Sequence, residues 1–238
     1  MKHTIRQNNP TRKVKDISII LLSAGIEDRA KGQGTPCLFD VGSVVMLDYQ
    51  IDTLNKIFAK CEIIPVIGFQ SSKIINRIHN KIGVVENQLY SETNCVESLR
   101  LGVNSTVSDN ILIIHGNTIF NQGVFVDHSF SKPFVLYDED GVMKEDNVGL
   151  ISNNGVLNNM YYGLDKKWCN ILYTTGKATK ELRSVINKEK YSKKLMYEVV
   201  NEVIKLTKIY TYKNSGNNLL EVNNFREQKH AINNIVKN

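Results

Sequence analysis

The chain has 238 residues, of which 42% are hydrophobic and 23% charged, and its formal net charge is +6. This length and composition are typical of one globular domain that buries its own core without disulfide or metal staples. No apolar run reaches the roughly 18–20 residues that a membrane span needs, and the polar start lacks the apolar segment of a secretory signal. The four cysteines are spaced singly, without a C-x-x-C pair, so we expect reduced thiols in a cytoplasmic protein.

The positive charge allows an anionic partner, but the pattern of basic residues does not favour nucleic acid. Basic residues are dispersed, apart from one group at residues 12–15 and another at residues 188–194. Aromatic residues do not interleave with them in the way that platforms for base stacking require. We therefore expect a solvated basic surface, and neither a nucleic acid nor a membrane as partner.

The first sixteen residues are polar, and we interpret them as an arm that is either flexible or docks a protein partner. Beyond it, short continuous apolar runs predict buried strands at residues 17–22, 63–68, 82–85 and 111–114. Apolar residues at helical spacing predict helices at residues 45–58, 71–79 and 95–103. This alternation favours right-handed crossovers and a mostly parallel sheet. Pro65 favours an edge position or a strand start for the second run.

After about residue 121 the pattern changes to shorter segments separated by turn residues. Strands are predicted at residues 134–137, 149–152, 168–173 and 208–212, and helices at residues 178–187, 195–206 and 225–236. The sequence D-E-D-G at residues 138–141 contains a D-x-D pattern, but its Asp-Gly end favours a hairpin turn over a metal site. We predict an arm at residues 1–16 followed by a single domain at residues 17–238.

The loop after the first strand has the composition of a phosphate-binding loop. Between Ser23 and Pro36 it contains three glycines and the cations Arg29 and Lys31. Glycines let backbone N–H groups approach phosphate oxygens, and a guanidinium can hold a phosphate through two parallel hydrogen bonds. Ligands of such sheets bind beyond the carboxyl ends of the strands, where this loop is expected. The Rossmann and Walker patterns are absent, so the loop alone is equally compatible with a plain surface loop.

Six short motifs, spread in order over about 200 residues, resemble those of one enzyme family. They lie at residues 21–36 (L-L-S-A-G, then R, then P), 48–54 (D-Y-Q-I-D-T-L), 66–69 (V-I-G-F), 90–99 (Y-S-E-T-N-C-V-E-S-L), 115–120 (H-G-N-T-I-F) and 220–223 (L-E-V-N). The family is the nucleotidyltransferases that make sugar nucleotides and CDP-choline. The pattern is most similar to that of bacterial choline-phosphate cytidylyltransferases.

The resemblance implies a three-layer, Rossmann-like α/β nucleotidyltransferase fold of the glycosyltransferase-A type, with a mostly parallel central sheet. Residues 17–120 would form the nucleotide-binding half and residues 121–238 the acceptor-side half. The implied reaction is attack of a phosphate monoester, such as phosphocholine or a sugar phosphate, on the α-phosphorus of a nucleoside triphosphate, with release of pyrophosphate. CTP or UTP is the favoured donor, and Mg²⁺ is the implied cofactor.

The resemblance also implies positions for the two ligands. The nucleotide-binding residues that it implies are Ser23, Ala24, Gly25, Arg29, Asn94 and Ser98. Asn94 and Ser98 lie one helical turn apart and can point together at a ligand, although Asn94 is also a natural helix N-cap. The acceptor is expected between this pair and two acidic residues, Glu198 and Glu221.

The chain departs from the family at three positions on which the chemistry depends. In the family, two aspartates hold Mg²⁺ and a lysine after the loop proline neutralises the transferring phosphoryl group. This chain has Asn117, Asn223 and Cys37 at these positions. Proteins hold Mg²⁺ through carboxylates and substrate phosphates. Loss of two carboxylates removes gross attraction on the order of 10 kcal/mol at an effective dielectric constant of about 20, so we expect catalysis to be impaired.

The sequence leaves three hypotheses open. In the first, the protein is a transferase in which Glu198, Glu221 and Lys31 replace the lost charges, with Arg29 also catalytic and Asn117 and Asn223 as weakened metal positions. In the second, it is a catalytically silent module that binds a nucleotide. In the third, it is a structural or assembly protein that reuses the fold, with its N-terminal arm as a docking segment.

Overall fold

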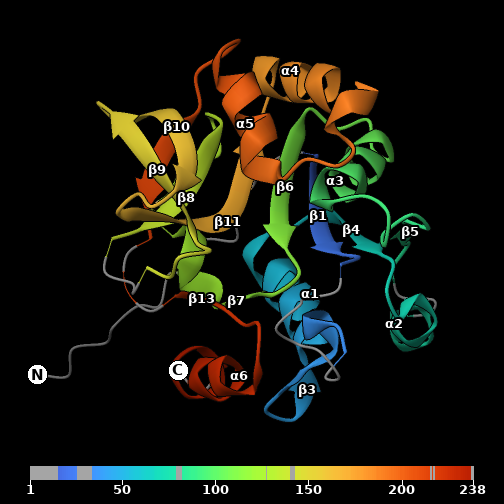
Figure 1. Cartoon of the computed structure of the whole chain (residues 1–238). Helices are drawn as coiled ribbons and strands as arrows, with labels where there is room; N and C mark the ends of the chain where they lie inside the picture. Colours follow the sequence, from blue (N-terminus) through green and yellow to red (C-terminus); the bar gives the residue numbers. More distant parts are fainter. Residues whose placement is uncertain are drawn as a thin grey trace, which may run out of the picture.

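Nine strands form one mixed sheet in the part of the chain that the computed structural model describes, namely residues 16–25, 34–78, 82–126, 128–139, 143–214, 216 and 218–236 (Figure 1). The strand order is β5-β4-β1-β6-β11-β8-β12-β10-β9. The strands are β1 (Ile17–Ser23), β4 (Cys61–Ile67), β5 (Val85–Glu86), β6 (Asn110–His115), β8 (Phe134–Asp138), β9 (Val148–Asn153), β10 (Val156–Tyr162), β11 (Lys166–Thr174) and β12 (Tyr210–Lys213). Two small sheets join β2 (Asp40–Val41) to β3 (Val44–Val45), and β7 (Thr118–Phe120) to β13 (Leu219–Glu221).

Helices cover both faces of the large sheet (Figure 1). The helices α1 (Met46–Ile57) and α2 (Ser71–Ile78) pack on one face, and α3 (Cys95–Asn104), α4 (Lys177–Ile186) and α5 (Met196–Ile204) on the other. The helix α6 (Phe225–Ala231) continues as a π-helical turn at Ile232–Val236 and packs near β2 and β7. Short 3₁₀ turns lie at Pro36–Leu38, Gln122–Phe125 and Glu189–Tyr191. The described chain therefore has the three layers that were expected.

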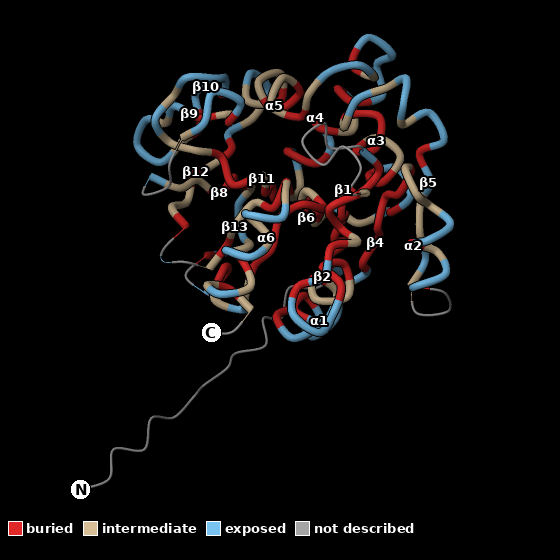
Figure 2. The backbone as a smooth tube through the Cα atoms, turned by 60° about the horizontal axis from the view of Figure 1, so that its bottom comes forward, coloured by how far each residue is buried: buried red, intermediate tan, exposed pale blue. Residues whose placement is uncertain are grey.

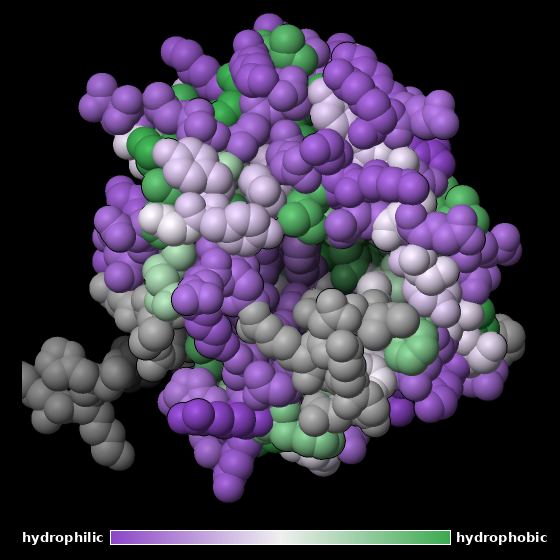
Figure 3. All heavy atoms as spheres, in the orientation of Figure 1, coloured by the Kyte–Doolittle hydropathy of each residue, from purple (hydrophilic) through white to green (hydrophobic). Residues whose placement is uncertain are grey.

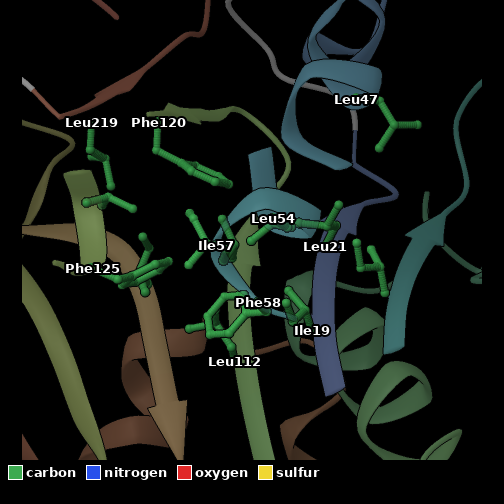
Figure 4. Packing of buried hydrophobic residues seen from close by; sticks show 14 of the residues in the cluster. Ile19, Leu21, Leu47, Leu54, Ile57, Phe58, Leu112, Phe120, Phe125 and Leu219 are labelled. Atoms are coloured by element: carbon green, nitrogen blue, oxygen red, sulfur yellow. The ribbon is translucent and has the colours of Figure 1, made fainter. Parts of the chain in front are cut away.

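The first strand shows why both faces need a helical cover. Its side chains alternate between the two faces, so Ile19 and Leu21 belong to the core under α1 and α2 while Ile20 belongs to the core under α3. Figure 4 shows Leu54 and Ile57 of α1 pointing at the first of these cores. Figure 2 shows the backbone buried along β1, β4 and β6 and more exposed along β9 and β10. Full burial of each such side chain contributes about 1.5–3 kcal/mol.

The prediction of a mostly parallel sheet is correct for the first half of the chain and wrong for the second. The strands β5, β4, β1 and β6 are parallel, whereas β11 is antiparallel to both β6 and β8, and β10 is antiparallel to β9 and β12. The turn between β9 and β10 explains part of this difference. Asn154 and Gly155 both have positive φ (51° and 73°), as a tight hairpin turn requires, and such a turn joins only antiparallel strands.

Most predicted elements are confirmed within a few residues, and three predictions need correction. The strand predicted at residues 82–85 is reduced to Val85–Glu86. This short β5 pairs only with the last two residues of β4, so Pro65 has little strand beside it although β4 is not the outermost strand. The predicted hairpin at residues 138–141 is wrong, because β8 pairs with β11 and β12 and not with β9. Residues 1–15, which make up most of the predicted arm, lie outside the described residues.

No helix among the described residues is long and apolar enough to cross a bilayer.

Candidate functional site

A cavity of about 420 Å³ lies beyond the carboxyl ends of β1 and β6, and Figure 3 shows this face of the molecule hollowed near its centre. This is the position at which sheets of this kind bind ligands. Its described lining comes from five segments: residues 22–25, residues 35–37, residues 87–98 in part, residues 115–117 and Leu195. None of the described lining residues is an aspartate, glutamate, lysine or arginine. Apart from His115, the described wall of the cavity therefore has no side chain that ionises near neutral pH.

The ends of β1 and β6 meet closely because a glycine separates them. The backbone N–H of Gly116 donates to the carbonyl of Leu22 at 2.8 Å. A Cβ atom at Gly116 would lie 2.3 Å from Oγ of Ser23, which is far inside contact distance. Any other residue at this position would therefore push residues 115–117 away from the loop that follows β1.

Asn117 is hydrogen-bonded to two residues at the end of the chain, and these bonds determine how its amide is oriented. Its Nδ2 donates to Oδ1 of Asn223 at 2.6 Å and lies 3.4 Å from Oε1 of Glu221. The second carboxylate oxygen of Glu221 pairs with Nζ of Lys167 at 3.1 Å. Because both neighbours of Nδ2 are acceptors, the amide nitrogen faces them and Oδ1 is the remaining polar atom.

Three buried polar atoms of the cavity wall have no hydrogen-bond partner among the described residues. They are Oγ of Ser23, Nε2 of His115 and Oδ1 of Asn117. Buried polar groups are nearly always paired, so unpaired atoms that line one cavity indicate a site for a polar ligand. Burial lowers the pKa of His115 to about 4, against a smaller opposing effect of Glu221, so its imidazole is neutral at pH 7.

The side of the cavity next to α3 is organised by two asparagines. Oδ1 of Asn94 accepts from the backbone N–H of Cys95 at 2.8 Å, so Asn94 is the N-cap of α3, as its position in the sequence allows. Asn87 follows β5 directly and is 2% exposed. Its Nδ2 donates to Oγ of Ser98 at 3.0 Å and to Oγ1 of Thr93 at 3.3 Å.

Solved structures with this arrangement of elements are found, although no protein-family model matches the chain and no curated protein matches its sequence. The CTP:phosphocholine cytidylyltransferase LicC of Streptococcus pneumoniae aligns with a TM-score of 0.73 at 16% identity, over 92% of this chain and 99% of that chain. A nucleoside-diphosphate-sugar pyrophosphorylase of Vibrio cholerae gives 0.73 at 12% identity, over 90% and 99%. The inositol-1-phosphate CTP transferase of T. maritima gives 0.68 at 14% identity, over 89% and 90%.

The chain has the nucleotidyltransferase fold. The resemblance of its motifs to this class of protein is therefore confirmed at the level of structure over about nine tenths of the chain. The identities of 12–16% show the fold and leave the substrate and the activity to be argued from the residues.

The nucleotidyltransferase fold raises the question of whether this chain can hold Mg²⁺, and its residues do not fit that ion. Among the described residues, no three His, Cys, Asp or Glu side chains lie together as metal ligands would. Glu221 is the carboxylate beside the two asparagines, and Lys167 already neutralises it. Burial alone would raise the pKa of Glu221, but Lys167 and the hydrogen bonds outweigh burial and lower it, so Glu221 is an ion-paired carboxylate. Mg²⁺ prefers free carboxylate oxygens and sheds water reluctantly, and a neutral amide pair offers it little.

The cavity gathers most of the predicted nucleotide-binding residues. Those that line it are Ser23, Ala24, Gly25, Asn94 and Ser98, together with Asn117 from the predicted metal positions. Arg29 and Lys31 lie outside the described residues, so their predicted roles stay predictions. Cys37 also lines the cavity, and burial raises the pKa of its thiol to about 11, which agrees with an unreactive side chain.

The two predicted acidic residues are not brought into this cavity. Glu198 begins α5, where its carboxylate accepts from the backbone N–H of Leu195 at 2.8 Å and pairs with Lys194 at 2.7 Å. It lines a separate cavity beside β10. Glu221 lines a third cavity, of about 410 Å³, on its Lys167 side. Both carboxylates thus have structural partners in place of the shared acceptor site that was expected.

Asn87 is the lining residue that the sequence analysis did not single out. Its signal was an asparagine directly after a strand in the half of the chain with parallel strands, where the carboxyl end of a strand faces the ligand. The signal was weak, because asparagine after a strand is also a common turn residue.

Proposed function

We propose that the protein binds a nucleoside-containing ligand in the main cavity, and that it has lost most or all of the capacity for Mg²⁺-dependent nucleotidyl transfer. Two of the compared proteins are named as CTP-using transferases, which supports CTP or UTP as the ligands to test first. The second hypothesis from the sequence, a catalytically silent nucleotide-binding module, is therefore the one that we adopt.

The observation that carries this proposal is the hydrogen-bonded amide pair of Asn117 and Asn223. At 2.6 Å the two side chains satisfy one another where the family is expected to hold its metal, and the neighbouring Glu221 is compensated by Lys167. Each lost carboxylate removes gross attraction for a divalent ion of several kcal/mol, of which desolvation offsets part. A net deficit of about 3–4 kcal/mol in the transition state would slow transfer about 10²–10³-fold.

One observation favours a residual transferase as a second candidate. Glu221 remains ionised 3.4 Å from Asn117, so a shift of Lys167 away from it would leave one carboxylate beside the cavity. The phosphorylated acceptor, phosphocholine or a sugar phosphate, belongs to this candidate only.

Isothermal titration with CTP and UTP, each with and without Mg²⁺, tests the proposal together with a pyrophosphate-release assay. We expect binding that Mg²⁺ does not strengthen, and little or no pyrophosphate. Mg²⁺-dependent binding with steady pyrophosphate release would support the residual transferase. Absence of binding to either nucleotide would overturn the proposal and favour a structural or assembly role.

The double substitution Asn117→Asp and Asn223→Asp should create the missing metal site. Two carboxylates about 2.6 Å apart repel one another, so we expect this variant to lose stability without metal and to regain it when Mg²⁺ is added. We also expect Mg²⁺ to strengthen its binding of CTP at least tenfold. Thermal unfolding and titration with and without Mg²⁺ measure both effects.

A matched control places the same two charges far from the cavity. Asn154→Asp and Asn158→Asp change two exposed residues of the β9–β10 hairpin. We expect no response of this variant to Mg²⁺. If the cavity variant responds to Mg²⁺ no more than this control does, the interpretation of Asn117 and Asn223 as former metal positions is wrong.

A further inference from the structure

The α3 side of the main cavity contains a buried amide whose orientation the backbone determines. The backbone N–H of Asn87 donates to the carbonyl of Ile67 at 2.8 Å, which ties the residue to the end of β4. The backbone N–H of Leu89 donates to Oδ1 of Asn87 at 3.0 Å. A backbone N–H can only donate, so the amide oxygen must face Leu89 and the amide nitrogen must face the other way. That nitrogen points at Ser98 and Thr93.

The protons around this amide can be followed one by one. Nδ2 of Asn87 donates to Oγ of Ser98 at 3.0 Å and to Oγ1 of Thr93 at 3.3 Å. The hydroxyl of Thr93 donates to the carbonyl of Leu89 at 2.6 Å, so its proton is used. Ser98 receives a proton from Asn87, and its own hydroxyl proton has no recorded acceptor among the described residues. Ser98 is 5% exposed and lines the cavity.

We propose that Asn87 is a positioning residue that makes Ser98 a hydrogen-bond donor to the bound ligand, so that the cavity selects a hydrogen-bond acceptor on this side. The inference rests on the proposed function, because the ligand is taken to be a nucleoside-containing molecule. The acceptor is then a carbonyl oxygen or an unprotonated ring nitrogen of the base, or a ribose oxygen. A group that can only donate is rejected here, because it would face a hydroxyl already supplied with a donor by Asn87.

The substitution Asn87→Asp reverses this proton arrangement with almost no change of shape. One carboxylate oxygen still accepts from Leu89, and the other accepts the hydroxyl proton of Ser98, which is then lost to the ligand. We expect the Kd for CTP or UTP, whichever the parent binds more tightly in metal-free buffer, to rise at least tenfold. Asn76→Asp on the exposed face of α2 adds the same charge away from the cavity and should leave this Kd unchanged.

The double-mutant cycle with Ser98→Ala separates positioning from a general structural role. Ser98→Ala alone should raise the Kd about as much as Asn87→Asp does. In the Ser98→Ala background, Asn87→Asp should raise it less than threefold further, because the proton that it would capture is already absent. Independent, additive losses would overturn the inference and show that Asn87 acts only through the fold.

The outcomes distinguish this inference from the proposed function. If the parent binds neither nucleotide, both are overturned. If the parent binds a nucleotide and Ser98→Ala leaves the Kd unchanged, the inference alone is overturned and the proposed function stands. If Asn87→Asp does not fold, Ser98→Ala still decides, since a serine-to-alanine change in a helix adds no charge and no bulk.

Discussion

His115, at the end of β6, is a histidine that the fold keeps uncharged. Its Nε2 is buried without a partner, and its ring meets the ring of Trp168 edge-on with centroids 5.5 Å apart. Nε1 of Trp168 donates to the carbonyl of Ile171 at 3.1 Å, which agrees with the interpretation of this tryptophan as a core residue. Protonation of His115 would place a charge in these surroundings without a counter-ion in contact, because Glu221 is already paired with Lys167.

This arrangement predicts a specific loss of stability in mild acid. In the unfolded chain the imidazole takes up its proton near pH 6.5, whereas in the folded chain it does so at about 4. Between these values the unfolded state binds more protons, so the free energy of unfolding falls as the pH is lowered from 6.5 to 4. His115 accounts for up to about 3 kcal/mol of this loss.

Denaturant unfolding of the parent and of His115→Gln at several pH values between 7 and 4 measures the effect. We expect the variant to lose less stability than the parent over this range. His230→Gln, at an exposed position on α6, is the control and should follow the parent. Equal pH dependence in the parent and in His115→Gln would contradict the prediction.

At the scale of elements, the position of α3 decides where Ser98 lies, and a glycine determines how closely α3 packs on the sheet. A Cβ atom at Gly102 would lie 2.8 Å from a methyl group of Ile20 on β1 and 2.8 Å from a methyl group of Val66 on β4. These methyl groups belong to buried, β-branched side chains with few alternative rotamers. The helix therefore sits on the sheet at a distance that only glycine allows.

Gly102→Val should force α3 away from β1 and β4. Overpacking of this kind costs about 1–3 kcal/mol, which lowers the melting temperature by several degrees in a domain of this size. We also expect weaker nucleotide binding, because Ser98 moves with the helix. Thermal unfolding and titration with CTP measure the two effects.

Gly83→Ala is the control for this change. A Cβ atom at Gly83 has no neighbour within 4 Å, and its φ is not positive, so the substitution should leave the melting temperature nearly unchanged. A variant Gly102→Val that is as stable as Gly83→Ala would show that α3 is not held at this distance by packing.

At the scale of the whole molecule, the two halves of the chain share one sheet. The strand β6, from the first half, pairs with β11, from the second, and the register joins Ile113 to Leu172 and Ile114 to Ile171. All four of these residues are at most 1% exposed. The cavity wall likewise combines residues from the ends of β1 and β6 with Leu195 from the second half.

Because the sheet is continuous, we predict that the described part of the chain unfolds in one cooperative step. The single tryptophan of the sequence, Trp168, lies on β11 and reports the second half by fluorescence, while far-ultraviolet circular dichroism reports all helices and strands. The two probes should give the same denaturant midpoint. Two separate midpoints would show that the halves unfold independently.

Local patterns in the sequence predicted the elements that local physics controls. Continuous apolar runs identified β1, β4 and β6, and helical periodicity identified α1 and α3, because burial and side-chain spacing are visible within one window of residues. The order of six motifs indicated the nucleotidyltransferase fold, which the structural comparisons confirm. The exchange of charged for neutral side chains at Asn117 and Asn223 was also visible in the sequence alone.

Only the tertiary structure decided which of these residues meet. Asn117 and Asn223 are 106 residues apart, and no periodicity could place their side chains 2.6 Å from each other. Folding paired Glu221 with Lys167 and made Glu198 the cap of α5, so neither acid stands in the cavity that the sequence assigned to them both. The antiparallel second half and the donor role of Ser98 depend in the same way on partners distant along the chain. A sequence shows which side chains are available, whereas hydrogen bonds and ion pairs between distant residues form only once the chain has folded.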